Sequence, residues 1–188
     1  AHHVEDVATE HFGFSLSKVG VSRLLGRLQR TRHGRTVGLL PQIQTLLEQG
    51  PGTAQSRAES AVVELTRELL PALERSQTTC NTFFDGAAAL IKARGGEGAA
   101  PLWPTPGGIQ LGEALSRESW DFVVSLQNLE RALRSLKDRL STAEGEEWEM
   151  YKAELGAVEN RLSQSRTILE SMMWEPPPDY VYWGELSG

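Results

Sequence analysis

Two apolar stripes that mirror each other constrain the fold of this chain more than any other feature. Between residues 122 and 140, apolar residues recur at alternating steps of four and three residues, and a second series runs from residue 148 to residue 162. The two series are one residue out of phase, so one straight helix would split its apolar face at the junction. Two helices folded back near residue 144 avoid this conflict. The predicted pairs are Leu140 with Trp148, Leu136 with Tyr151, Leu133 with Leu155, Leu129 with Val158 and Leu126 with Leu162.

The antiparallel helical hairpin that results is expected to span residues 113–175. At about 1.5 Å per residue each arm would be roughly 30 to 40 Å long, so the hairpin forms a protrusion and not a compact ball. A run of three prolines, Pro176 to Pro178, ends the second arm because proline cannot continue a helix. The spacing therefore predicts an elongated helical bundle.

A second long helix is predicted for residues 53–94. Apolar residues recur along it at helical spacing, and Pro71 is the one residue expected to kink it. The segment 95–108 that follows is rich in glycine and proline, and we expect a loop without regular structure there.

Residues 1–52 are predicted to form basal helices and one short strand. The expected helices run to about Phe12, from Ser17 or Ser22 to about Arg30, and from Leu40 to Gln49. The expected strands are Phe14–Ser17, Ile109–Leu111 and Tyr180–Trp183, the last within a returning segment at 179–186. The predicted fold class is mainly α, with a long antiparallel helical hairpin and a small antiparallel β-sheet near the chain termini.

Length, cysteine content and hydropathy exclude several classes of protein. The 188 residues suit one domain. No apolar run approaches the roughly 20 residues of a membrane-spanning helix, so no membrane partner is predicted. Cys80 is the single cysteine, which excludes an internal disulfide and a site with several thiolate ligands. Arginine exceeds lysine, as is typical of a GC-rich bacterial genome, and we expect a cytoplasmic, nucleoid-associated location.

Catalytic and metal-binding motifs are missing from the sequence. It contains no G-x-x-x-x-G-K-[ST] phosphate loop, no G-x-S-x-G, no H-E-x-x-H and no C-x-x-C. His3 and His11 lie two turns apart on a predicted helix, but no carboxylate accompanies them at ligand spacing. Surface or packing roles are therefore favoured for these histidines, and no metal site is predicted.

The charge of the chain is divided unevenly along its length. Residues 17–47 hold six basic residues and no acidic one; subtracting +6 from the chain total of −6 leaves −12 on the remainder. The basic residues are Lys18, Arg23, Arg27, Arg30, Arg32 and Arg35. On a helix through residues 21–30, Arg23, Arg27 and Arg30 would share one face, with Arg32 and Arg35 in the turn that follows. This pattern predicts contact with nucleic-acid phosphates, and the alternative is a solvated helix face.

The tryptophans divide into two groups. Trp120, Trp148 and Trp174 lie on or near the helical stripes, and we expect them in the core and not as platforms for base stacking. Trp103 lies in the glycine- and proline-rich loop, where it either anchors the loop to the body or presents its ring to a DNA base.

The two ends of the chain carry a family resemblance. Residues 1–8, AHHVEDVA, resemble the segment that begins within the D-E-A-H box of XPD/DinG-like superfamily 2 DNA helicases. Residues 180–185, YVYWGE, resemble the strand by which the chain of that family re-enters the first motor domain. Between these motifs the family carries its arch domain, a mostly helical insertion beside the DNA-binding surface. The resemblance identifies residues 1–188 as a single arch-like insertion domain of a longer protein.

The resemblance also implies a function. An arch domain is non-catalytic and helps to guide or enclose single-stranded DNA beside the remaining motor domains. By resemblance His2 is the last residue of the box and would couple the nucleotide site to the moving parts of the motor. ATP and magnesium would be bound by the longer protein, whose iron-sulfur cysteines, where present, lie upstream, so Cys80 inherits no cluster role. The chain alone is predicted to be inactive.

A different class of function is the alternative. In this second interpretation the chain is a helical protein–protein interaction module, unrelated to helicases, whose long hairpin docks a partner. The two interpretations differ in the expected position of the chain ends. An insertion must leave and re-enter one motor domain at adjacent points, so the segment near Val4 is expected to lie near Trp183.

Overall fold

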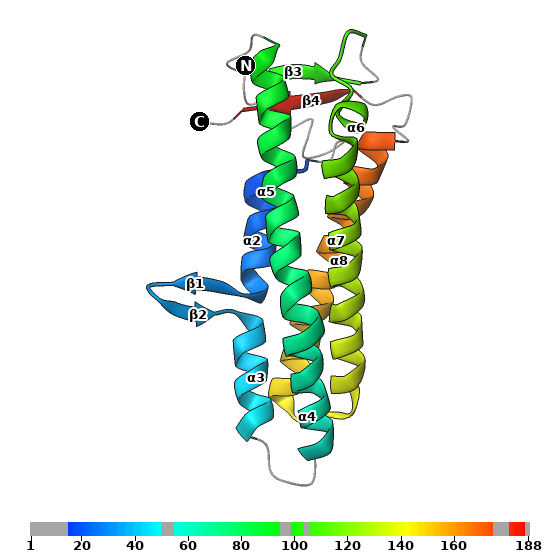
Figure 1. Ribbon diagram of the computed structural model, residues 1–188. Coiled ribbons are helices and arrows are strands. Elements are labelled where there is room, and N and C mark those ends of the chain that lie inside the picture. The colour runs from blue at the N-terminus through cyan, green and yellow to red at the C-terminus, as the bar shows by residue number, and fades with distance from the viewer. Residues whose placement is uncertain (1–14, 50–54, 95–98, 104–105, 175–180, 187–188) are drawn as a thin grey trace.

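The computed structural model describes residues 15–49, 55–94, 99–103, 106–174 and 181–186. Its longest helices are α5 (Leu70–Ala93), α7 (Ser116–Arg139) and α8 (Glu146–Trp174). Figure 1 shows these three helices running along one another in an elongated bundle, with a small sheet at one end and a strand hairpin projecting from the flank. The predicted fold class is confirmed.

Helices α7 and α8 form the predicted antiparallel hairpin. A short 3-10 turn, η3 (Leu140–Thr142), ends the first arm, and Gly145 adopts a φ of 122° just before the second arm begins. Side chains from the facing stripes are buried; Leu133 and Leu155 are each 1% exposed. Burial of both stripes against each other is the arrangement that the out-of-phase spacing predicts.

Ion pairs join the two arms along the edge of the buried stripes. Glu159 of α8 accepts hydrogen bonds from Arg134 at 2.9 Å and from Lys137 at 2.6 Å, both on α7. Farther along, Arg166 of α8 donates to Glu130 of α7 at 2.9 Å. Glu130 and Glu159 are buried, so their carboxylates lose contact with water. The hydrogen bonds from the cationic partners compensate this loss of hydration.

The second long helix is nearly continuous, as predicted. It consists of α4 (Gln55–Glu64), a π-helical turn η2 (Leu65–Leu69), and α5. Proline at position 71 lacks an N–H and its ring crowds the carbonyl four residues earlier, so it is tolerated in the first turn of a helix but kinks or breaks a helix interior. The π turn directly before Pro71 absorbs this conflict, with the N–H of Leu70 bonded to the carbonyl of Leu65.

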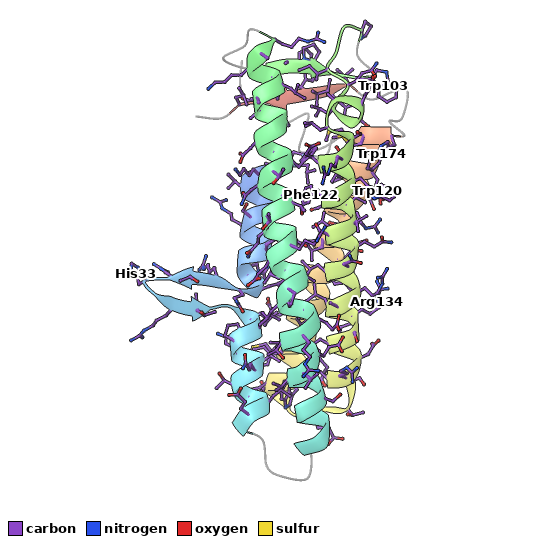
Figure 2. The ribbon with its side chains drawn as sticks, viewed as in Figure 1. His33, Trp103, Trp120, Phe122, Arg134 and Trp174 are labelled. Carbon is purple, nitrogen blue, oxygen red and sulfur yellow. The ribbon has the colours of Figure 1, made fainter. Side chains whose placement is uncertain are left out.

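The interface between α5 and α7 combines aromatic rings with hydroxyl groups. Phe83 and Phe122 are buried with their ring centroids 5.6 Å apart, and Figure 2 shows Phe122 between the helices. The Ser76 hydroxyl donates to the Ser125 carbonyl at 3.1 Å, and the Thr79 and Ser125 hydroxyls lie 2.7 Å apart. These polar groups are satisfied within the core.

The chain reaches the long helices through α2 (Lys18–Leu28) and α3 (Leu39–Gln49), which pack along the bundle. The strand predicted at Phe14–Ser17 is wrong for its described residues, 15–17. Ser17 has extended dihedral angles because it is the N-cap of α2, and its hydroxyl accepts from the N–H of Gly20 at 3.0 Å. Helix α3 starts one residue earlier than predicted, with Pro41 in its first turn.

The sheet at the end of the bundle pairs β3 (Ala99–Leu102) with β4 (Tyr182–Glu185) antiparallel. Strand β3 lies inside the segment predicted to lack regular structure, so that prediction is wrong for residues 99–102. Strand β3 forms because β4 provides backbone hydrogen-bond partners for it, and the residues of β3 alone do not indicate this pairing. The strand predicted at Ile109–Leu111 is wrong beyond Ile109, which makes a single parallel bridge to Leu102, because helix α6 begins at Leu111.

Several predictions fall on residues outside the described part of the chain. They are the helix ending near Phe12, the position of Val4 relative to Trp183, and every statement about His2, His3 and His11. In the described residues, no helix combines the length and apolar character that crossing a membrane requires.

The prediction that Trp120 and Trp174 lie in the core is wrong. They are 61% and 39% exposed and contact each other edge to face on the surface. Phe122 on α7 and Met173 on α8 are buried instead. At about 100° per residue, Trp120 lies about 200° around its helix from Phe122 and Trp174 about 100° from Met173, so both indoles point away from the core. Trp148, in contrast, is half-buried against the core beside Tyr151, as predicted.

Candidate nucleic-acid interface

The basic segment forms a β-hairpin that the sequence did not indicate. Strands β1 (Arg30–Arg32) and β2 (Arg35–Val37) pair antiparallel between α2 and α3, and all their residues are exposed. The predicted turn is confirmed as the connection between them: His33 and Gly34 have φ values of 51° and 73°. Positive φ at both central residues gives a turn whose twist matches paired strands. Figure 2 shows His33 at the tip, away from the bundle.

The register of the hairpin places three arginines on one face. Arg32 is paired with Arg35, and Arg30 with Val37. Because paired residues share a face and side chains alternate along a strand, the arginines 30, 32 and 35 project to the same side. Thr31 and Thr36 are paired on the opposite side. The hairpin thus has one cationic face and one hydroxyl face.

The cationic face has no carboxylate partner in the described chain. None of the ion pairs among the described residues includes Arg30, Arg32 or Arg35. Like charges directly opposite each other in a two-stranded ladder destabilise it by roughly 0.2–1 kcal/mol. An anion bound on this face would relieve that repulsion.

A groove with a mixed apolar and cationic lining continues from the base of this hairpin. It lies between α2 and α5, has a volume of about 530 Å³, and Arg30 lines it where the hairpin leaves the bundle. Its other charged residues are Arg23 and Lys18, and among the described residues its lining holds no carboxylate. The rest of the lining holds uncharged hydrogen-bonding groups (Ser22, Gln29, Gln77 and Asn81) and the small or apolar residues Val19, Leu25 and Gly26. Cationic and amide side chains together suit a phosphate backbone with its sugars.

The structure separates the arginines that were predicted to share a helix face. Helix α2 ends at Leu28, so Arg30 lies on β1 and the prediction of one helical face through Arg30 is wrong. Arg27 faces α8, where it forms an ion pair with Glu154. Lys18 is paired with Asp85 at 2.7 Å. In the described part of the chain, Arg23 and the three hairpin arginines take part in no ion pair, and Arg23 lines the same groove as Arg30.

The helix ends early because its C-cap residue leaves the helical region. Gln29 has φ −159° and ψ 137°, which starts the extended course of β1. The return of the chain requires Gly38, whose φ is 137° and where an added Cβ would lie 2.5 Å from the carbonyl oxygen of Leu28. Only glycine fits this close approach, so Gly38 fixes the base of the hairpin against the end of α2.

The acidic, histidine and cysteine side chains of the described residues are not gathered into a metal-binding group. No group of three or more His, Cys, Asp or Glu side chains is placed there to hold a metal ion. Cys80 is buried, and burial raises the pKa of its thiol to about 11. A neutral, enclosed thiol is suited to packing and not to nucleophilic chemistry.

The comparisons with known proteins return no match. No protein-family model matches the chain, and neither a curated protein nor a solved structure shows significant similarity to it.

Proposed function

We propose that this chain is the arch domain of an XPD/DinG-like DNA helicase and that its cationic hairpin holds single-stranded DNA beside the motor. The observation that carries the DNA-binding part is the face formed by Arg30, Arg32 and Arg35, exposed and without acidic partners among the described residues. The assignment to the helicase family rests on the resemblance of residues 1–8 and 180–185.

The arrangement of the arginines favours binding that is independent of sequence. Arg30 and Arg32 lie two residues apart on one strand, a separation of about 7 Å, which is comparable to the distance between successive phosphates of an extended single strand. Guanidinium groups bind phosphate oxygens through charge-assisted, bidentate hydrogen bonds. Contacts to phosphates position a strand but do not read its bases. The hairpin would therefore guide DNA without selecting a sequence.

A matched pair of triple variants tests the DNA contact. Arg30, Arg32 and Arg35 are changed together to Gln, and the control changes Arg117, Arg131 and Arg161, which are exposed on α7 and α8, to Gln. Both variants lose the same net charge. Binding to a fluorescent oligothymidine of about 16 nucleotides is measured by anisotropy. We expect the hairpin variant to lose affinity and the control to keep it. Equal affinities of the two variants would contradict the proposal.

The helicase assignment is tested separately by ATP turnover. Hydrolysis requires a phosphate loop, a metal-holding Asp and a water-orienting Glu, and the sequence contains no phosphate loop. We expect no ATPase activity from this chain and DNA-stimulated activity from the longer protein that contains it. In that longer protein, the hairpin variant is expected to reduce DNA stimulation while leaving basal turnover unchanged. The absence of a phosphate loop upstream of this chain in its reading frame would refute the assignment.

A further inference from the structure

Three tryptophans gather on the surface at the end of the bundle that carries the β3–β4 sheet. Trp120 and Trp174 lie edge to face with ring centroids 6.2 Å apart, and Trp103 follows β3. Figure 2 shows the three along the same side of that end, away from the projecting hairpin. Trp103 is 38% exposed. Indole rings are rarely left this accessible in a group unless they contact something.

A cavity of about 340 Å³ lies between Trp103 and Trp174. Its floor is apolar and buried, formed by Leu102, Ile109 and Met173. The close approach of α6 (Leu111–Ala114) to the end of α8 shapes it, since an added Cβ on Gly112 would lie 2.3 Å from the Met173 carbonyl oxygen. An apolar floor with two indole walls matches the general character of a ligand site.

The charge at this cavity is opposite to that of the hairpin. Glu113 lines it, is exposed, and takes part in no ion pair among the described residues. Arg117, near Trp120, is paired with Asp121, and Arg166, two turns before Trp174, is paired with Glu130 and Glu170. Arg94, which lines a neighbouring pocket with Glu113, donates to the Gly107 carbonyl at 3.2 Å. Among the described residues the Glu113 carboxylate therefore forms no ion pair, and it lies beside two indole faces that also attract cations.

We propose that this cavity binds an arginine or lysine side chain of a partner protein, presented between apolar neighbours. The cation would lie against the indole faces of Trp103 and Trp174 with Glu113 as its counter-ion, and the apolar neighbours would cover Trp120 and the cavity floor. Nucleobases also stack on indoles, but a phosphate backbone would be repelled by Glu113 and meets no unpaired cation in the described lining. This inference does not depend on the proposed function, since it uses none of the hairpin residues.

The test uses the full chain and a defined peptide. A blocked peptide of sequence Leu-Arg-Leu-Arg-Leu is titrated by calorimetry, with Leu-Gln-Leu-Gln-Leu as the neutral control. We expect the arginine peptide to bind and the neutral peptide to bind at least about 5-fold more weakly. Trp174→Ala should weaken binding about 5- to 30-fold, and Glu113→Gln about 2- to 5-fold. Trp183→Ala, which removes a tryptophan that is 60% exposed but outside the cavity, should change nothing.

Other results would overturn the proposal. Equal binding of the two peptides, or no binding of either, would show that the cavity does not select a cation. Loss of oligothymidine binding in Trp174→Ala would assign the surface to nucleic acid. Concentration-dependent dimerisation in sedimentation that Trp174→Ala abolishes would assign it to a second copy of the chain. Glu113→Gln is a mild surface change, so it remains informative if Trp174→Ala fails to fold.

Discussion

Replacement of Gly38 by Ala is expected to destabilise the junction between the cationic hairpin and the bundle. The φ of 137° at Gly38 lies in a region that is nearly restricted to glycine, where another residue costs roughly 1–3 kcal/mol. In addition, the new Cβ would lie 2.5 Å from the Leu28 carbonyl oxygen and 2.9 Å from the Gln29 Cα. Both are backbone atoms, so relief requires the chain to shift, at about 1 kcal/mol or more. We expect a total loss of about 3 kcal/mol.

Gly34 at the tip of the same hairpin provides the matched control. Its φ is 73°, but no atom lies within 4 Å of the position of an added Cβ, so Gly34→Ala should cost only about 1 kcal/mol. For a chain of this size, thermal unfolding followed by circular dichroism should show a Tm drop of about 6–12 °C for Gly38→Ala and about 2–4 °C for Gly34→Ala. Equal drops would refute the conclusion that Gly38 fixes the hairpin base.

Two further predictions concern the bundle. Burial alone would raise the pKa of Glu159, but hydrogen bonds from Lys137 and Arg134 outweigh it and lower that pKa, so Glu159→Gln should destabilise the protein by about 1 kcal/mol near neutral pH. Because the folded pKa is lowered, this contribution is fully present above the unfolded carboxyl pKa of about 4.3 and is lost as the pH falls through the lower folded pKa. The difference in urea melts should therefore shrink as the pH falls below about 4.3, and a difference that stays constant down to about pH 2 would contradict the ionic origin. Cys80 should react with a thiol reagent near neutral pH only on unfolding, as burial raises its pKa to about 11, and rapid labelling of the folded protein would disprove this.

The long helices could be predicted from the sequence because their apolar positions repeat over many turns. The step of one residue between the stripes ending at Leu140 and starting at Trp148 indicated a fold-back, and burial of both stripes confirms it. The position of the helix irregularity near Pro71 can also be predicted from the sequence, because proline alone lacks the backbone N–H that a regular helix requires.

The hairpin that carries the candidate site could not be predicted with the same means. Its strands have three residues each, which is too short for an alternating pattern to differ from chance. The one local signal in the sequence is the turn at His33 and Gly34, which the structure contains. The end of α2 before Arg30 is visible only in the structure, in the extended dihedral angles of Gln29. Strand pairing, and not helical spacing, therefore decides which arginines lie together.

The surface tryptophans show that nearness in sequence to an apolar stripe does not make a residue part of it. At about 100° per residue, Trp120 lies about 200° around α7 from the buried Phe122, and Trp174 about 100° around α8 from the buried Met173. Helical spacing therefore places both indoles off the buried face. Strand β3 could not be predicted from its own residues, because its partner β4 lies far away in the sequence.

The salt dependence of single-strand binding tests the central claim, that the hairpin arginines contact phosphates, most directly. Each phosphate contact contributes about −0.7 to the slope of log K against log salt for single strands. Changing Arg30, Arg32 and Arg35 to Gln should therefore flatten the slope by about 2, with an affinity loss of about 100-fold near 0.1 M salt. The control at Arg117, Arg131 and Arg161 should keep the original slope. A hairpin variant whose slope equals that of the unaltered protein would contradict the account.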